Sequence, residues 1–456
     1  MQLVAPLGLC LALGAALLRC ASARSVAGDR LLVLVPTVDA AADYSEFLAG
    51  LTQRGFDVSV RAAANTSVAL HVDGSRQYDH AALLAPAAKR LGAGLTAHSF
   101  VRFVEDGGNL LVAGSSDMAD LTRKLAAQFG VDFEKHGTRV VDHSHHLAPT
   151  DHAVVAASRL VAVPAVLSPA LLEGPTTVYF KGIGHRYNAS NPLLAAVLTG
   201  APTTYSAPAG SAELSGQSLG LVTVFQTRSN ARAAFSGSAD LFSDALMREK
   251  GSSNRQFARD IARWAFQEKA VLRETAHRHY LAATGAQPEH YRVSNDVVYE
   301  VDISVYSNDA WRPYEAADVQ FEAIMLDPYI RATLNCTGSS SSAATYRGDI
   351  RLPDRYGTFT FRVNYKRPGL SSLDVKDTVA IWPLRHDEYP RFLSAAYPYY
   401  AGSFVMVVGF LALCAVWLWS AEPTATATAK PASKPTATPA TKPAAKPKAK
   451  AKPKSS

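Results

Sequence analysis

The longest apolar stretch of the chain lies near its C-terminal end, where residues 401–421 include no charged side chain. At about 1.5 Å of rise per residue, a helix of this length spans roughly 31 Å, the thickness of the hydrocarbon core of a bilayer. A buried core helix is the alternative, but the charge-free run and its aromatic flanks favour a transmembrane helix over 401–421. The rings expected at the two membrane interfaces belong to Tyr397, Tyr399, Tyr400, Trp417 and Trp419.

A second apolar stretch, Leu7–Leu18, is too short to span a membrane and is followed by Ala21-Ser22-Ala23. This order of segments is typical of a secretory signal peptide, so we predict that residues 1–23 are removed. The large part that follows then lies in the secretory lumen. The lysine-rich residues 422–456 lie on the cytosolic side, in agreement with the positive-inside tendency.

The tail, residues 422–456, is composed largely of Ala, Pro, Thr and Lys and has no aromatic residue. Such a composition cannot bury a core, which predicts a disordered cytosolic segment. Its last five residues, KPKSS, place Lys452 and Lys454 in the K-x-K-x-x pattern that retrieves membrane proteins to the endoplasmic reticulum. So many lysines can produce the pattern by chance, and the predicted topology is what makes these two lysines candidates for retrieval.

From Arg30 to about Leu272, short continuous apolar runs alternate with stretches of helical period. Continuous apolar strands separated by helices indicate a parallel, doubly wound, Rossmann-like α/β domain, which we assign to residues 24–275. The pattern predicts helices over 45–54, 96–106 and 254–269, the last with Phe257, Ile261 and Trp264 on one face. The predicted strands are residues 31–36, 56–60, 80–86, 109–114, 218–227 and 233–238.

From about Tyr291 the hydrophobic period changes to two. The apolar side chains of Val297, Tyr299 and Val301 alternate with polar ones, and residues 319–325 and 359–365 repeat this pattern. Half-buried strands at this spacing predict an antiparallel β-sandwich, which we assign to residues 285–395.

The net charge of +7 is not a property of the lumenal part. The tail alone contributes +7, and Arg19 with Arg24 contributes +2, so the remainder carries about −2. Composition therefore gives no electrostatic reason to expect a nucleic acid partner. Cys336 is the one cysteine expected in the lumen, which excludes an intrachain disulfide there. Three sequons suit this compartment and provide candidate N-glycosylation sites at Asn65, Asn188 and Asn335.

Three motifs could carry chemistry, and each has a simpler interpretation. The string Gly92-Ala93-Gly94 fits a dinucleotide fingerprint but does not follow the first strand, so a loop is favoured. The DHSHH segment, 142–146, lacks the spacing of metal ligands on a helix. In FSGSADLFSD, 235–244, a helix cap by Ser238 explains the residues better than a nucleophile does. We therefore predict no catalytic, cofactor-binding or metal-binding residue and no cofactor.

Several stretches together resemble one protein family: YFKGIGH (179–185), SGSADLFSD (236–244), RWAFQEKAVLR (263–273), LDPYIR (326–331), LPDRYGTFTFRVNY (352–365) and RFLSAAYPYYAGSF (391–404). They are similar, in order and from about Leu31 to Ser420, to the 48 kDa subunit family of the oligosaccharyltransferase complex. The long, repetitive tail departs from this pattern.

The resemblance implies a non-catalytic subunit that scaffolds the transfer of a dolichol-linked oligosaccharide to Asn in N-x-S/T. It implies a single-pass protein of the endoplasmic reticulum membrane, whose partners are the catalytic and other subunits and the lipid bilayer. Contact with the translocon is a further interaction left open. Two alternatives remain at this point: an independent lumenal enzyme that uses the α/β domain, and a surface adhesion or receptor protein.

Overall fold

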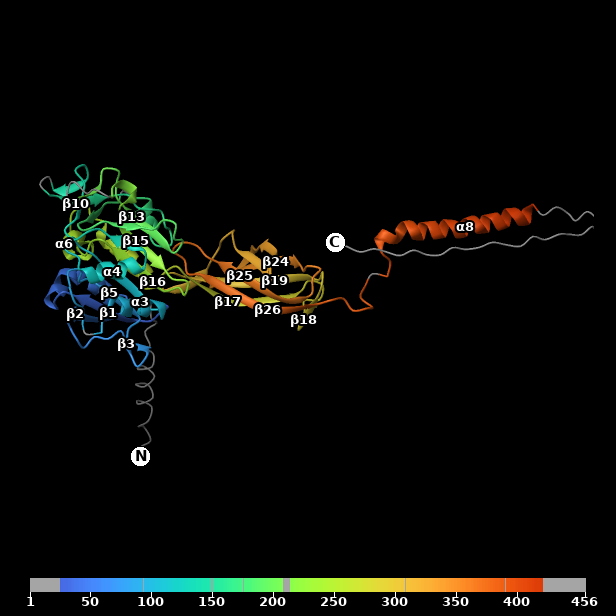
Figure 1. Cartoon of the computed structure of the whole chain (residues 1–456), viewed down its shortest axis with the longest axis horizontal. Coiled ribbons are helices and arrows are strands. Elements are labelled where there is room, and N and C mark those ends of the chain that lie inside the picture. Colours follow the sequence, from blue (N-terminus) through green and yellow to red (C-terminus); the bar gives the residue numbers. More distant parts are fainter. Residues whose placement is uncertain are drawn as a thin grey trace, which may run out of the picture. The chain divides into compact units, whose positions relative to one another are not determined.

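The computed structural model describes residues 25–420 except 93, 149–150, 175, 208–213, 308 and 390. The predicted signal peptide, the tail and the candidate retrieval residues Lys452 and Lys454 lie outside the described residues. The chain divides into two units, residues 1–384 and 385–456. The first unit contains an α/β domain, residues 25–270, and a β domain, residues 271–384 (Figure 1).

Five parallel strands form one part of the sheet in the α/β domain, in the order β2-β1-β5-β6-β16. The first strand, with the sequence RLLVLV, is buried over its last five residues because it has neighbours on both edges and both faces. The bounds are β1 Arg30–Val35, β2 Asp57–Ala62, β5 His80–Leu83, β6 Asn109–Ala113 and β16 Arg232–Ser236.

Helices cover both faces of these parallel strands. Alternate residues of β1 enter different apolar clusters, Val33 with helices α2 (Ser45–Gln53) and α7 (Asn254–Ala265), and Leu34 with α3 (Ala97–Glu105) and α4 (Asp120–Gln128). Helix α3 begins at Thr96, whose hydroxyl accepts a hydrogen bond from the Ser99 amide in a capping box. The doubly wound arrangement predicted from the sequence is therefore present in this part of the sheet.

The sheet is not parallel throughout, and this corrects the prediction. Strand β15 is antiparallel to β16 because only residues 227–231 connect them, too few for a crossover helix. Asn230 turns the chain there with φ +70°. The remaining strands of the mixed sheet are antiparallel too, with bounds β7 Val131–Phe133, β12 His185–Tyr187, β13 Leu194–Thr199 and β15 Gly220–Gln226.

Small sheets and short helices complete the α/β domain. Two pairs of strands form small sheets, β3 His71–Val72 with β4 Ser75–Arg76 and β8 Arg139–Val141 with β14 Tyr205–Ala207, and a third sheet contains β9 His146–Ala148, β10 Asp151–Ala157 and β11 Val178–Phe180. The short helices are α5 Pro169–Leu172 and α6 Asp244–Met247. The 3-10 turns are η1 Asp39–Tyr44, η2 Gly216–Ser218 and η3 Asp240–Phe242.

The β domain consists of two five-stranded sheets that share one buried apolar cluster. Their strands are antiparallel, as predicted, except for β18, which pairs with β26 in parallel. Strand β17 begins before residue 275, the predicted end of the α/β domain, continues beyond it and pairs with β19. One sheet comprises β17 Val271–Leu281, β19 Asp296–Ser307, β20 Ala310–Pro313, β23 Asn335–Ser339 and β24 Ala344–Arg351. The other sheet comprises β18 His290–Arg292, β21 Gln320–Ile324, β22 Pro328–Thr333, β25 Gly357–Tyr365 and β26 Leu373–Trp382.

The loop between β25 and β26 joins the two domains. The indole N–H of Trp264 donates to the Gly369 carbonyl at 2.7 Å, and the Gln226 amide donates to the Leu370 carbonyl at 2.7 Å. Asn230 exchanges hydrogen bonds with the main chain of Ser372 at 2.6 and 3.0 Å. These bonds fix the β domain on the α/β domain.

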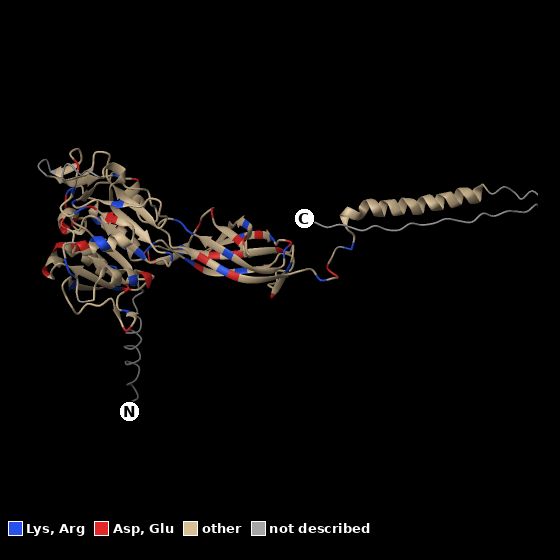
Figure 2. Cartoon of the chain, in the orientation of Figure 1, with Lys and Arg blue, Asp and Glu red and all other residues tan. Residues whose placement is uncertain are grey.

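The second unit contains one long helix, α8 Tyr397–Trp419, preceded by the 3-10 turn η4 Ser394–Ala396. No charged side chain lies on it, in contrast to the two domains of the first unit, where both signs of charge are interspersed (Figure 2). It is the one helix among the described residues that is long and apolar enough to cross a membrane, and none of its side chains is fully buried.

Candidate functional site

The carboxyl ends of the parallel strands are the usual ligand site of a doubly wound sheet. Here the main chain itself covers the ends of β6 and β16. The Ile183 amide donates to the Gly237 carbonyl at 2.9 Å, and the Gly114 amide donates to the Ser236 carbonyl at 2.7 Å. A Cβ atom added to Gly182 would lie 2.1 Å from the Gly237 carbonyl oxygen. Main-chain atoms therefore close the carboxyl ends of β6 and β16.

Asp240 and Lys181 are ionisable groups beside these strand ends. Partial burial raises the pKa of Asp240, against the opposing charge of Lys181, whose Nζ lies 3.9 Å from the carboxylate. Beside them the Ser238 hydroxyl accepts from the Leu241 amide at 3.1 Å and donates to the Lys181 carbonyl at 2.6 Å. Ser238 thus stabilises the 3-10 turn η3, where the sequence predicts a helix. The SGSADLFSD motif thus builds a turn.

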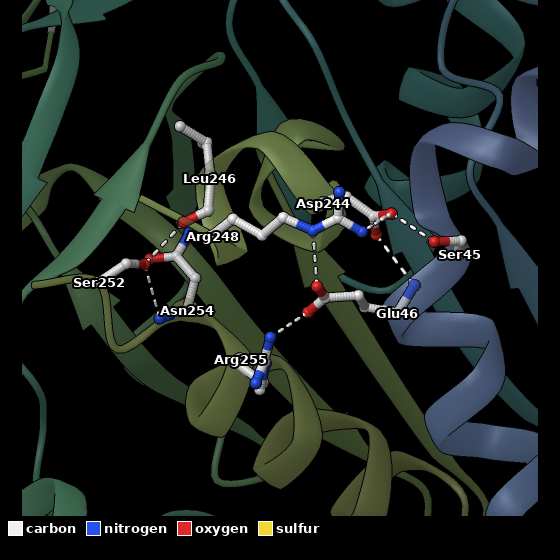
Figure 3. A network of polar contacts seen from close by, with 8 residues as sticks. All are labelled: Ser45, Glu46, Asp244, Leu246, Arg248, Ser252, Asn254 and Arg255. Atoms are coloured by element: carbon white, nitrogen blue, oxygen red, sulfur yellow. Dashed lines mark hydrogen bonds and ion pairs between the residues drawn. The ribbon is translucent and has the colours of Figure 1, made fainter. Parts of the chain in front are cut away.

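Asp244, the last residue of the same motif, binds the start of helix α2, although the two are far apart in the sequence. The Asp244 carboxylate accepts from the Ser45 hydroxyl at 2.5 Å and from the Glu46 amide at 2.9 Å, so it caps the N-terminus of α2 (Figure 3). Glu46 in turn binds Arg248 and Arg255 at 2.7 and 2.5 Å, and Figure 3 shows it between the two guanidiniums. Sequence reasoning missed this network, which joins α2, α6 and α7.

A groove of about 1010 Å³ lies beside this network, between α2, α7 and the α5 turn. Its polar wall includes Arg54, whose guanidinium binds the buried Glu268 carboxylate at 2.8 Å, and burial lowers the pKa of Arg54. Its apolar floor includes Phe47, Leu171 and Met247. A groove that places amide and guanidinium groups over an apolar floor is suited to binding a ligand or partner rather than to catalysing a reaction.

The DHSHH segment is a folded loop organised by Asp142. This carboxylate is fully buried and accepts from the Ser144 amide and from the Thr203 and Thr204 hydroxyls, each at 2.8 Å. Burial alone would raise the pKa of Asp142, but these hydrogen bonds hold it below its usual value. The ring of His152 contacts the rings of His143 and His146 edge to face. Among the described residues, no group of three His, Cys, Asp or Glu is arranged to hold a metal ion.

The three candidate glycosylation sites lie on different parts of the first unit. Asn188 and Asn335 are exposed, the latter on β23 at the edge of its sheet. Asn65 is partly buried, and its side-chain oxygen accepts hydrogen bonds from the Ser67 amide and hydroxyl at 2.9 and 2.8 Å.

The predicted interface aromatics all lie on α8, within its first turns and its last turn. From the first to the last of them, at about 1.5 Å of rise per residue, is roughly 33 Å, which matches the distance between the interfaces of a bilayer. All five side chains are exposed: Tyr397, Tyr399, Tyr400, Trp417 and Trp419.

A buried arginine is the largest feature that the sequence did not reveal. Arg232 is fully buried and donates to the carbonyls of Trp264, Lys269 and Ala270 at 2.9, 2.7 and 2.6 Å. Its guanidinium also lies over the Trp264 ring, 4.8 Å from the centroid. Burial lowers the pKa of Arg232 to about 9. This residue connects β16 to the end of α7 and to the segment that leads into the β domain.

Comparisons with known proteins agree over most of the chain. The model of the OST48 N-terminal domain matches residues 22–268, and that of the OST48 middle domain matches residues 278–421. A solved structure of a ThuA-like protein from Parabacteroides merdae covers 52% of this chain and 89% of its own at 13% identity, but its TM-score of 0.29 is too low to support an argument.

The curated relatives are subunits of one enzyme complex. A dolichyl-diphosphooligosaccharide–protein glycosyltransferase 48 kDa subunit from Arabidopsis thaliana is 33% identical over 410 residues, which is 86% of this chain and 92% of the relative. The subunit of the same name from Caenorhabditis elegans is 35% identical over 416 residues, with the same coverage. The subunit wbp1 from Schizosaccharomyces pombe is 36% identical over 391 residues, 82% of this chain and 89% of the relative. The chain therefore belongs to the OST48 family.

Proposed function

We propose that this chain is a non-catalytic subunit of the oligosaccharyltransferase complex, which transfers a dolichol-linked oligosaccharide to Asn of N-x-S/T in nascent proteins. The observation that carries the proposal is the similarity, across both domains and α8, to relatives named as 48 kDa subunits of that transferase. The chain then lies in the endoplasmic reticulum membrane with residues 24–395 in the lumen. Its partners are the catalytic and other subunits and the bilayer.

The chemistry of the α/β domain supports a scaffolding role. The polar groups of its motifs are engaged with the fold: Ser238 and Asp244 cap turns and helices, and Asp142 organises a loop. The carboxyl ends of β6 and β16 are covered by main chain. Among the described residues α8 is the one candidate span, and it has no neighbouring span there with which to enclose a lipid-linked donor. The two domains and α8 provide the surfaces through which other subunits would bind.

Purification of the tagged full chain in mild detergent tests the assembly. We expect a catalytic subunit in near-equal amount, and recovery of the chain alone would contradict the proposal. In cells depleted of the endogenous subunit, the Asp240→Asn variant should restore N-glycosylation of a reporter to the wild-type level. A fully assembled complex with this variant but without transfer activity would show that the subunit contributes a catalytic group.

The sites outside the α/β core remain proposals with direct tests. We expect glycans on the exposed Asn188 and Asn335, detected as peptide mass shifts that Asn→Gln variants abolish. Replacing Lys452 and Lys454 by Ala should release the unassembled chain from the endoplasmic reticulum, while the assembled chain stays with its partners. An unassembled double variant that does not move would show that the K-x-K-x-x pattern is not read.

A further inference from the structure

Exposed aromatic side chains gather at one end of the β domain. Of the described residues before Arg385, three aromatic residues are exposed: Tyr329, Tyr356 and Trp382, at 45%, 70% and 50%. Leu326, at 91%, is the most exposed large apolar side chain of the same region. We call these four residues the aromatic tip. Exposed apolar groups that cluster mark an interaction surface.

The strand register brings the four residues to the same end. Gly357, next to Tyr356, pairs with Ile381, next to Trp382. The turn between β21 and β22, which holds Leu326, follows Ile324, and Ile324 pairs with Thr360 near the start of β25. Tyr329 is the second residue of β22.

Local contacts hold these side chains in place at the surface. The Trp382 ring stacks on His290, with centroids 4.2 Å apart and planes at 17°, and the Arg292 guanidinium lies 5.8 Å from the Trp382 ring centroid. The Tyr329 ring contacts Phe359 at 5.4 Å. Two rings of the aromatic tip, those of Trp382 and Tyr329, are therefore held at the surface by neighbouring side chains.

The covalent chain indicates what covers this surface. Fourteen residues, 383–396, connect Trp382 to α8, and when fully extended they reach about 50 Å. The connection is thus long enough for the aromatic tip to reach the bilayer that α8 is suited to span. Rings with an apolar body and a polar group prefer the headgroup layer of a membrane.

The charges around the aromatic tip indicate which kind of lipid the tip would contact. Two arginines, Arg292 at the end of β18 and Arg355 before β25, are matched in number by Asp327 in the turn between β21 and β22 and Asp354 beside Arg355. A mixed, near-neutral rim gives no strong attraction to anionic lipid. We propose that the aromatic tip inserts into the headgroup layer of a zwitterionic membrane on the lumenal side, as a second membrane contact beside α8.

A fluorescent probe at the aromatic tip of the full chain tests this contact. All four cysteines, Cys10, Cys20, Cys336 and Cys414, are replaced by serine, and Leu326→Cys carries the environment-sensitive dye NBD in phosphatidylcholine nanodiscs. The matched control is Ala310→Cys, exposed on the turn at the opposite end of β19. Lipids brominated near the headgroup should quench the probe at 326 at least twofold more than the probe at 310. Equal quenching at both positions would overturn the proposal.

A second variant separates the lipid contact from its alternatives. Adding Tyr356→Asp to the labelled chain should reduce quenching at 326 at least twofold and leave the thermal unfolding midpoint unchanged, because Tyr356 is largely exposed. Unchanged quenching would show that the aromatic rings do not hold the contact. In the purified complex, a probe at 326 that is shielded from water but not quenched by lipid would assign the aromatic tip to a protein partner and overturn the membrane assignment.

Discussion

The two domains of the first unit differ in where they keep their ionisable side chains. In the α/β domain, Arg232, His80 and His185 are completely buried. In the β domain, the most buried acidic and basic side chains among the described residues are His279 and Glu300, which keep 5% and 7% of their surface exposed. These ionisable side chains of the α/β domain are bonded to the interior of the fold, whereas those of the β domain lie mainly on the faces of its sheets. The α/β domain should therefore tolerate little change at its charged groups, and the β domain should tolerate more.

The largest effect is expected from Arg232→Met. The substitution removes three hydrogen bonds from a buried guanidinium and leaves the carbonyls of Trp264 and Ala270 with only the amides of Gln267 and Ser371 as donors. Hydrogen bonds to a charged group contribute about 1.5–3 kcal/mol each, and removal of the buried charge offsets part of this loss, so we expect a loss of about 3–5 kcal/mol in the free energy of unfolding. Urea unfolding of the full chain in detergent measures it. The matched control, Arg228→Met, alters an exposed residue of the adjacent turn and should change stability by less than about 0.5 kcal/mol.

A smaller effect is expected from Gly237→Ala at the covered edge of the parallel strands. The new Cβ would lie 1.8 Å from the Ile183 carbonyl oxygen, so main chain must move on one side or the other. Such overpacking costs up to about 3 kcal/mol. Gly50→Ala is the control, because a Cβ at this position inside α2 meets nothing within 4 Å and alanine favours a helix by about 0.5–1 kcal/mol. Equal stability of the two variants would show that the edge is open and able to accept a ligand.

Acidification should destabilise the α/β domain through its buried histidines. Burial lowers the pKa of His80 to about 4 and that of His185 to about 3. The unfolded chain takes up these protons near pH 6.5 and the folded chain does not, so stability is complete above pH 6.5 and falls as the pH decreases below it. At pH 5 each histidine should have removed about 2 kcal/mol from the free energy of unfolding.

The His80→Gln variant isolates one of these contributions. It should show a difference between pH 7.5 and pH 5 that is smaller by about 2 kcal/mol than in the unchanged chain. His136→Gln, at an exposed position, should leave the pH dependence as it is. The same slope in all three proteins would mean that water reaches His80 and that its imidazole is protonated in the folded state.

Elements with a clear hydrophobic period could be predicted from the sequence. The run RLLVLV became β1, and Phe257, Ile261 and Trp264 lie buried on α7 as their spacing indicated. Ser238 caps the turn that its position before Asp240 suggested. In each case the partners lie close in sequence or the apolar pattern is unambiguous, so local physics determines the outcome.

What could not be predicted depends on contacts between distant residues. Asp244 caps α2, and Arg232 binds carbonyls that follow it by more than thirty residues, yet both residue types are usually exposed. Strand β17 was not recognised because its middle, RETAHRHY, is polar and becomes a strand by pairing with β19. The three-residue strands β7 and β12 are too short to show a period.

The smallest effect is expected from Arg362→Gln on the surface of the β domain. Arg362 and Asp374 form two hydrogen bonds of 2.7 and 3.2 Å between β25 and β26, but both side chains contact water and Lys376 also binds Asp374 at 2.8 Å. Solvent-exposed ion pairs contribute less than about 1 kcal/mol and are weakened by salt. We therefore expect urea unfolding in 0.5 M NaCl to show no measurable difference from the unchanged chain. A loss above about 2 kcal/mol would place this pair with Arg232 among the groups that hold the fold, and the distinction between the two domains would fail.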